Sequence, residues 1–339
     1  MSRPSSYPLH LALQGGGAHG AFTWGVLDAL LADGRARLDA VSGTSAGAIN
    51  AVVLAQGLMD GGPSGAREAL RRFWGAVGTA LPFDLATPSA DGGRMLIAPP
   101  LRLLLQWTQF LSPGQLNPLD LHPLRDILRE QVDFERLRRV RPLRLYIAAT
   151  RASSGRLRLF REHEISLEAV MASTCLPTLH RAVQIDGQAY WDGGYAANPP
   201  VAALIEAGGA RDLLLVLLTP LEHAGEPETA PEIRQRTLEF AFSAAFLREM
   251  ALLADMQVRA RRRWWDLGEH RRSLAGLRLH LINGGDALAA FGTESKLAAQ
   301  MGFFETLFSL GSEQAQAWLG SHGGDPGRLP GLDLQATFG

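Results

Sequence analysis

The chain has 339 residues, of which 46% are hydrophobic and 20% are charged, and its formal net charge is −1. This composition is that of a globular protein with enough apolar material for one large or two modest domains. A near-neutral charge argues against a nucleic-acid-binding protein, because contacts with a phosphate backbone need an excess of basic residues. We therefore expect no nucleic-acid partner.

The single cysteine, Cys175, excludes an internal disulfide framework and fits a reducing compartment. Residues 1–10 contain no apolar signal core. The richest apolar run, residues 212–220, is far shorter than the roughly 20 residues that a membrane-spanning helix needs. We therefore expect a soluble, cytoplasmic protein whose contact with a membrane, if there is one, is peripheral.

Strands and helices are predicted to alternate along most of the chain. Strands are predicted over residues 9–13, 38–42, 143–149, 157–161, 182–185, 213–218 and 277–282. Helices are predicted over residues 20–33, 45–59, 64–78, 122–131, 166–174, 199–207 and 233–263. Because the strands read as continuous apolar runs, the alternation indicates an α/β fold with a mainly parallel central sheet covered by helices on both faces.

A glycine-rich turn, GGGAHG at residues 15–20, follows the first predicted strand. Gly15, Gly17 and Gly20 fit the G-x-G-x-x-G spacing of dinucleotide-binding sites. The same turn fits a cradle of backbone N–H groups for an anion or an oxyanion. Glycine permits both, because it lets the backbone bend sharply or lie close to a ligand.

The segment GTSAG, residues 43–47, follows a predicted strand and opens a predicted helix. This is the context of a nucleophile elbow, in which a serine stands on a tight turn between a strand and a helix. The turn needs small residues two positions before and after the serine, and Gly43 and Gly47 meet that need. The Ser45 hydroxyl is then exposed at the helix N-terminus, where the N–H of Ala46 can stabilise an oxyanion.

An irregular insertion, residues 80–121, interrupts the alternation and mixes Pro and Gly with the apolar segment 101–111, LRLLLQWTQFL. An insertion of this kind in a compact domain is typical of a functional loop or lid. A plain buried helix over residues 101–111 fits the pattern as well.

A nucleophilic serine needs a base. Of the nine histidines, His223 follows a late predicted strand and comes nearest to the chain order of a Ser–Asp–His triad; His270 and His280 fit less well. Asp192 is the better candidate, because it follows a short apolar stretch and two glycines place it on a tight turn. An Asp-Gly-Gly turn by itself is commonplace as a structural feature.

The order of these segments resembles that of the patatin-like phospholipase family. The matching segments are GGGAHG (15–20), GTSAG (43–47) and DGG (192–194), supported by residues 172–194, with their Ser-x-x-x-Pro segment, and by NPP (198–200). The resemblance implies a patatin-like three-layer core over residues 9–219 and a mainly helical C-terminal extension, residues 220–339, packed on it.

The resemblance also implies the activity of a serine acyl hydrolase of the phospholipase A, lysophospholipase or esterase type. Ser45 and Asp192 would form a catalytic dyad that cleaves lipid carboxylic esters through an acyl-enzyme. No metal or other cofactor is expected. The alternative is a catalytically weak or idle protein of the same fold that binds lipid or a protein partner.

The resemblance assigns the oxyanion hole to the glycine turn and to the residue after the nucleophile. The assigned residues are Gly15, Gly16, Gly17 and Ala46, with Ala18, His19, Gly20, Gly43, Thr44, Gly47, Gly193 and Gly194 as supporting motif residues. His19 stands where many members of the family carry Arg or Lys. A titratable, weaker cation is therefore expected beside the turn, and this substitution keeps the idle alternative open.

Four smaller points concern Asp39, His180, residues 259–265 and the insertion 80–121. Asp39 could have been the ribose ligand of a dinucleotide site, but it opens its predicted strand, whereas that acid belongs at a strand's C-terminal end. His180 is either a satisfied surface histidine or part of the pocket lining. The basic and aromatic run 259–265 is either an anchor for anionic lipid or a solvated helix end. The insertion 80–121 is expected to cover the Ser45 pocket as a hinged lid and to bind the acyl chain.

Overall fold

An eight-stranded sheet lies at the centre of the computed structural model, which describes residues 6–80, 86–88, 95–97, 112–117, 122–223, 225–262, 273–321 and 331–339. Its strands are β1 (Tyr7–Leu13), β2 (Ala36–Gly43), β5 (Arg144–Arg151), β6 (Leu157–Arg161), β7 (Val183–Ile185), β8 (Gln188–Asp192), β9 (Asp212–Leu217) and β10 (Arg278–Asn283). The order across the sheet is β10–β9–β1–β2–β5–β8–β7, and β6 pairs with β5. From β10 to β5 the strands are parallel, whereas β6, β7 and β8 pair antiparallel with their neighbours.

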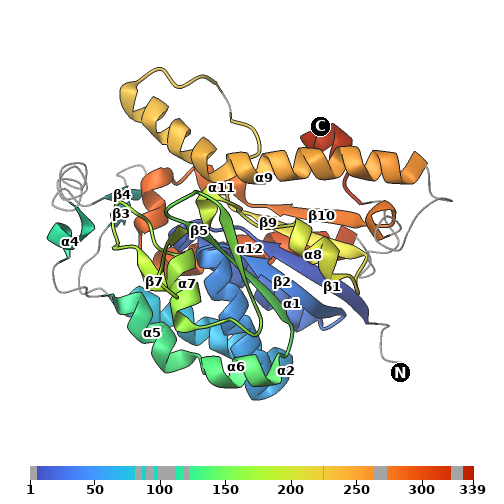
Figure 1. Cartoon of the computed structure of the whole chain (residues 1–339), viewed down its shortest axis with the longest axis horizontal. Helices are drawn as coiled ribbons and strands as arrows, with labels where there is room; N and C mark the ends of the chain where they lie inside the picture. The colour runs from blue at the N-terminus through green and yellow to red at the C-terminus, as the bar shows by residue number, and fades with distance from the viewer. Residues whose placement is uncertain are drawn as a thin grey trace.

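Helices pack on both faces of this sheet (Figure 1). They are α1 (Gly20–Asp33), α2 (Ala46–Thr79), α5 (Pro123–Gln131), α6 (Phe134–Val140), α7 (Leu167–Ser173), α8 (Ala202–Ala207), α9 (Ala230–Arg262), α11 (Gly285–Ala289), α12 (Met301–Ser321) and α13 (Leu334–Phe338). Leu9, Leu11 and Leu13 of β1 are fully buried in one core with α1, α2 and α12, and Ala12 lies in the opposite core with α8 and α9. This alternation of side chains along a strand produces the three layers. The predicted α/β class with a mainly parallel, doubly covered sheet is confirmed.

Short elements complete the described part of the chain. They are η1 (Gly17–His19), η2 (Gly193–Tyr195), η4 (Thr293–Leu297), α4 (Pro113–Leu116), and a separate hairpin of β3 (Ala86–Pro88) and β4 (Met95–Ile97). Each of the first two follows the C-terminal end of a sheet strand, β1 or β8. The polar loops that carry the candidate site therefore begin at strand ends.

The predicted helices 45–59 and 64–78 are joined in one element, α2, whose backbone is non-helical at Gly61 and Gly62. Gly62 has a φ of 62°, and Pro63 follows it without an N–H to continue the helical ladder, so the axis bends there. The elements without a sequence prediction include β8, α6, α11, α12 and α13. β8 has only five residues between glycine turns, too few for a clear periodicity.

The proposed boundary at residue 219 stays a prediction. The C-terminal region contributes β10, which pairs with β9 and extends the central sheet.

Within the insertion 80–121, the apolar segment 101–111 lies outside the described residues, as do residues 263–265 of the basic and aromatic run. β4 packs against η4, which itself packs against η1 of the glycine turn.

Candidate active site

Ser45 occupies the sharp turn between β2 and α2, as the sequence predicts. Its backbone has φ 52° and ψ −121°, a left-handed conformation that is costly for a residue with a side chain. The turn is tight enough to exclude side chains on both sides. A Cβ on Gly43 would lie 2.5 Å from the Gly47 carbonyl oxygen, and one on Gly47 would lie 2.2 Å from the Leu13 carbonyl oxygen. The geometry is that of a nucleophile elbow.

Asp192 ends β8, and its neighbours fix its backbone from both sides. Its N–H donates to the Cys175 carbonyl oxygen at 2.7 Å, and its carbonyl accepts from the Thr150 hydroxyl at 2.8 Å. The carboxylate caps η2 by accepting the N–H of Gly194 at 2.8 Å. Gly193 and Gly194 therefore form the tight turn that the sequence predicts after the acid.

The hydroxyl of Ser45 lies close enough to the carboxylate of Asp192 to affect its pKa, although the two residues come from distant parts of the chain. Asp192 is 1% exposed. Burial disfavours the charged carboxylate and raises its pKa to about 7, while the hydrogen bonds from Gly194 and Ser45 act in the opposite direction. A carboxylate of this pKa is poised to exchange a proton with a serine hydroxyl near neutral pH.

The glycine turn passes beside the elbow. A Cβ on Gly15 would lie 2.7 Å from the Thr44 carbonyl oxygen. Gly17 has a φ of 60°, and a Cβ there would lie 2.3 Å from the Lys296 carbonyl oxygen of η4. Glycine is therefore required at both positions, because the backbone of one loop lies directly against that of another.

The assignment of Gly15 to the oxyanion hole needs correction. Its N–H donates to the Oδ1 atom of Asn198 at 2.7 Å, so this donor already has a buried partner. Within the described residues, the N–H groups of Gly16, Gly17 and Ala46 make no hydrogen bond. These three amides are the donors that can receive an oxyanion.

The remaining motif residues support these loops. Ala18 and His19 are buried in η1, and the carbonyl of Gly20 accepts the Asn50 side chain at 2.9 Å. Thr44 donates its hydroxyl to the Ala197 carbonyl oxygen at 2.7 Å. The supporting residues therefore hold the loops in place.

The expectation that His19 acts as a weak cation is wrong. Its side chain is 2% exposed, and burial together with the charge of Lys296 lowers its pKa to about 3. Its Nε2 atom lies 2.7 Å from the Ser295 hydroxyl, which itself donates to the Gly292 carbonyl oxygen. His19 is neutral at physiological pH and packs the glycine turn against η4.

The alternative histidine bases are His223, His270 and His280, whereas His180 is expected to be a surface histidine or part of the pocket lining. His223 faces Glu239 at 3.7 Å, and His280 is bonded to Asp212 at 2.9 Å. His270 lies outside the described residues, and His180 stacks on His122 with ring centroids 4.5 Å apart. Within the described residues, none of these side chains is hydrogen-bonded to Ser45.

Asp39, the alternative ribose ligand, pairs with His10 at 3.2 Å and with Arg144 at 2.5 Å. It lies toward the N-terminal half of β2, whereas the glycine turn follows the C-terminal end of β1, which is parallel to β2. The structure therefore uses Asp39 in an ion-pair cluster away from the glycine turn.

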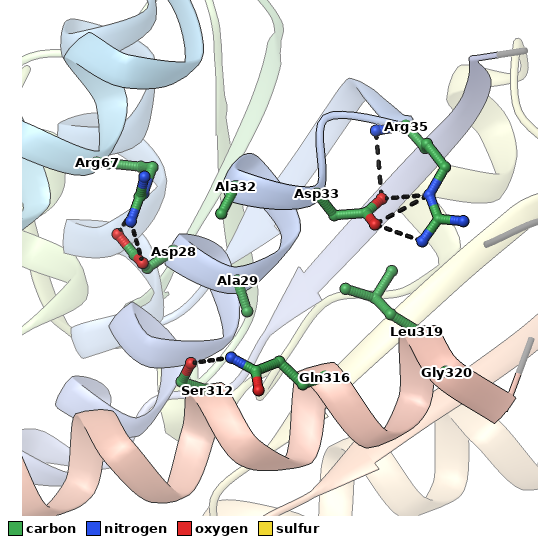
Figure 2. Close-up of a pocket in the computed structure, with 10 residues that line it drawn as sticks. All are labelled: Asp28, Ala29, Ala32, Asp33, Arg35, Arg67, Ser312, Gln316, Leu319 and Gly320. Carbon is green, nitrogen blue, oxygen red and sulfur yellow. Dashed lines mark hydrogen bonds and ion pairs between the residues drawn. The ribbon is translucent and has the colours of Figure 1, made fainter. Parts of the chain in front are cut away.

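A cavity of 630 Å³ lies between α1 and α12, away from the glycine turn and the elbow. Figure 2 shows the ion pairs Asp28–Arg67 and Asp33–Arg35 on its walls. None of the predicted site residues lines it. Among the described residues, no group of three His, Cys, Asp or Glu side chains could hold a metal ion, and no helix has the length and apolarity to cross a bilayer.

Two polar residues next to the site have no role in the sequence analysis. The Ser173 hydroxyl accepts the Ser45 N–H at 2.9 Å, and Asn198 holds Gly15. Both belong to segments quoted for the family resemblance, the Ser-x-x-x-Pro segment and NPP. Their place in these segments could have indicated that Ser173 and Asn198 lie near the site. The partners of the two side chains, however, depend on how the loops meet in three dimensions.

A sequence model described as Patatin-like phospholipase matches residues 11–205 of the chain. No match among curated protein sequences reaches significance. Among solved structures, the chain is similar to VipD from Legionella pneumophila, with 18% identity, 95% of this chain and 68% of that chain covered, and a TM-score of 0.45. It is also similar to the heterodimeric ExoU–SpcU complex from the type III secretion system of Pseudomonas aeruginosa, with 19% identity, 99% and 75% covered, and a TM-score of 0.30.

Proposed function

Because the chain belongs to the patatin-like phospholipase family, whose sequence model matches more than half of it, we propose that it is a serine acyl hydrolase that cleaves carboxylic esters of lipids. The observation that carries the proposal is the placement of Ser45, at a nucleophile elbow, beside the buried carboxylate of Asp192. A serine hydroxyl paired with a base of pKa about 7 is the minimum machinery for acyl transfer.

In the first half of the reaction, the Ser45 oxygen attacks the ester carbonyl carbon and its proton passes to Asp192. The carbonyl oxygen becomes an oxyanion that accepts hydrogen bonds from the amides of Gly16, Gly17 and Ala46. Ala46 is the first residue of α2, so the positive end of that helix adds to the stabilisation. The carbon–oxygen bond to the alcohol then breaks, and Asp192 returns the proton to the departing alkoxide.

In the second half, water attacks the carbonyl carbon of the acyl-enzyme. Asp192 takes one proton from that water, and the same amides receive the second oxyanion. The bond between the acyl group and Ser45 breaks, the serine oxygen regains a proton from Asp192, and a free carboxylic acid leaves. The cycle needs no redox step.

The insertion 80–121 fits this chemistry as a cover for the acyl chain. In support of this role, β4 of the insertion lies against η4, and η4 lies against η1 of the glycine turn. An apolar cover excludes water from the ester and accepts a hydrocarbon chain.

A fluorophosphonate probe tests the function directly. The probe phosphonylates an activated serine, so we expect labelling of the unaltered chain and none of Ser45→Ala. Ser154→Ala, at an exposed turn, is a matched control that keeps full labelling. Labelling that persists in Ser45→Ala would exclude this serine as the nucleophile. Lipid or partner binding without labelling of the unaltered chain would favour the idle alternative.

A further inference from the structure

We propose that Asn198 is a positioning residue of the oxyanion hole: its side chain holds Gly15 and so sets where the next two amides of the glycine turn point. The inference rests on the proposed function, because it assigns a role within that site. It does not extend to the Ser45–Asp192 pair, which Asn198 does not touch among the described contacts.

Asn198 holds the turn from two directions. It is 4% exposed, and its Oδ1 atom accepts the N–H of Gly15 at 2.7 Å. Its own carbonyl oxygen accepts the side-chain amide of Gln14 at 3.4 Å. Two consecutive residues at the end of β1 are therefore bonded to one asparagine, and the shorter of the two bonds is made by its side chain.

Gln14 extends this attachment to the neighbouring strand. Its Oε1 atom accepts the N–H groups of Leu218 and Thr219, directly after β9, at 2.5 Å and 3.0 Å. The start of the glycine turn is thus held between the end of β9 and the segment that contains Asn198. Because Gly16 follows Gly15 directly, the anchored peptide determines the direction in which the first free amide points.

The segment that carries Asn198 also contains the base and contacts the residue before the nucleophile. It begins at Asp192 and continues through η2, and the carbonyl of Ala197 accepts the Thr44 hydroxyl at 2.7 Å. One stretch of seven residues, 192–198, therefore contains the acid and contacts both the residue before the nucleophile and the glycine turn. Oxyanion stabilisation depends on donors that are fixed before the charge develops, and this stretch fixes them relative to the base.

Asn198→Ala removes the acceptor of Gly15 and leaves the dyad untouched. The matched control is Gln257→Ala on α9, because Gln257 is also 4% exposed and its side-chain amide also bonds to buried backbone, the carbonyls of Leu274 and Leu277. Asn198→Asp keeps an oxygen acceptor at the same position. Each variant is assayed for kcat and KM with p-nitrophenyl butyrate, for inhibition by a trifluoromethyl ketone, and for Tm.

We expect Asn198→Ala to lower kcat by at least about 30-fold, since loss of one oxyanion donor costs about 100- to 1000-fold and a displaced donor less. KM should change by less than about threefold, and binding of the ketone, whose adduct mimics the oxyanion, should weaken in parallel with kcat. Asn198→Asp should recover part of kcat, and Gln257→Ala should lower Tm with kcat retained.

The proposal is overturned if Asn198→Ala keeps kcat and ketone binding. It is also overturned if the variant loses Tm alone, as the control does. Should Asn198→Ala fail to fold, Asn198→Asp decides: retention of kcat within about tenfold, well short of the roughly 100-fold that one lost donor costs, supports the proposal, and a larger loss overturns it. A lack of hydrolysis and probe labelling in the unaltered chain would overturn the proposed function itself.

Discussion

The carboxylate of Asp192 is buried and lies beside the hydroxyl of Ser45 at the elbow. Burial makes the charged form costly, and the partial compensation by two hydrogen bonds leaves the pKa at about 7. The same burial that raises its pKa toward that of the proposed base therefore makes Asp192 a source of instability. Activity and stability are coupled at this one side chain.

Ser45→Ala and Asp192→Asn are each expected to lower kcat/KM for p-nitrophenyl esters by several orders of magnitude. The double variant should be little worse than either single one, because nucleophile and base act as a unit. Ester hydrolysis, followed by the absorbance of the released p-nitrophenolate, checks this prediction. Circular dichroism confirms that the variants fold. Full activity in Asp192→Asn would exclude the dyad and return attention to His223.

Activity should depend on pH through the ionisation of Asp192. The base must be deprotonated to accept the serine proton, so kcat/KM should rise about tenfold per pH unit below the pKa of about 7 and level off above it. His19 should add no inflection between pH 5 and 8, because its pKa is about 3. A pH profile of kcat/KM checks both; an activity that falls through pH 7 would contradict the assignment.

Asp192→Asn should stabilise the fold at alkaline pH. The folded pKa of about 7 exceeds the ordinary value of 3.8, so the folded state binds the proton more tightly and stability falls as pH rises from about 4 to 7. At about 1.4 kcal/mol per pKa unit, the penalty at pH 8 is at most about 4 kcal/mol, and the neutral amide removes it.

Urea unfolding of Asp192→Asn at pH 4 and pH 8 measures this difference. The gain should be present at pH 8 and small at pH 4. Asp186→Asn, at an exposed turn, is the control that should show no such difference. An equal gain at both pH values would mean that the buried charge is not its cause.

Hydrolysis should continue in excess EDTA. The proposed steps use a serine, a carboxylate and backbone amides, none of which needs a metal ion. Initial rates with and without the chelator check this. Loss of activity that one added metal restores would show that an ion takes part in the reaction.

Much of the candidate site follows from short segments of sequence. The spacing of Gly43, Ser45 and Gly47 predicts the elbow. A Cβ added to either glycine would lie within 2.5 Å of a backbone oxygen, so the turn permits almost no other residue at these two positions. The sequence pattern does not predict β8, although the two glycines after Asp192 predict the tight turn at its end. A five-residue strand gains its stability from pairing with β5 and β7, and that pairing leaves little trace in the local pattern.

The sequence by itself determined the alternation of strands and helices, the elbow and the tight turn after Asp192, because each depends on spacing and turn chemistry within a few residues. Only the tertiary structure decided that Gly15 is bonded to Asn198, that His19 is buried and neutral, and that Ser45 meets Asp192. Hydrogen-bond partners and pKa values depend on which distant loops meet and on how much water they exclude. Those quantities belong to the packed molecule and have no counterpart in the spacing of residues along the chain.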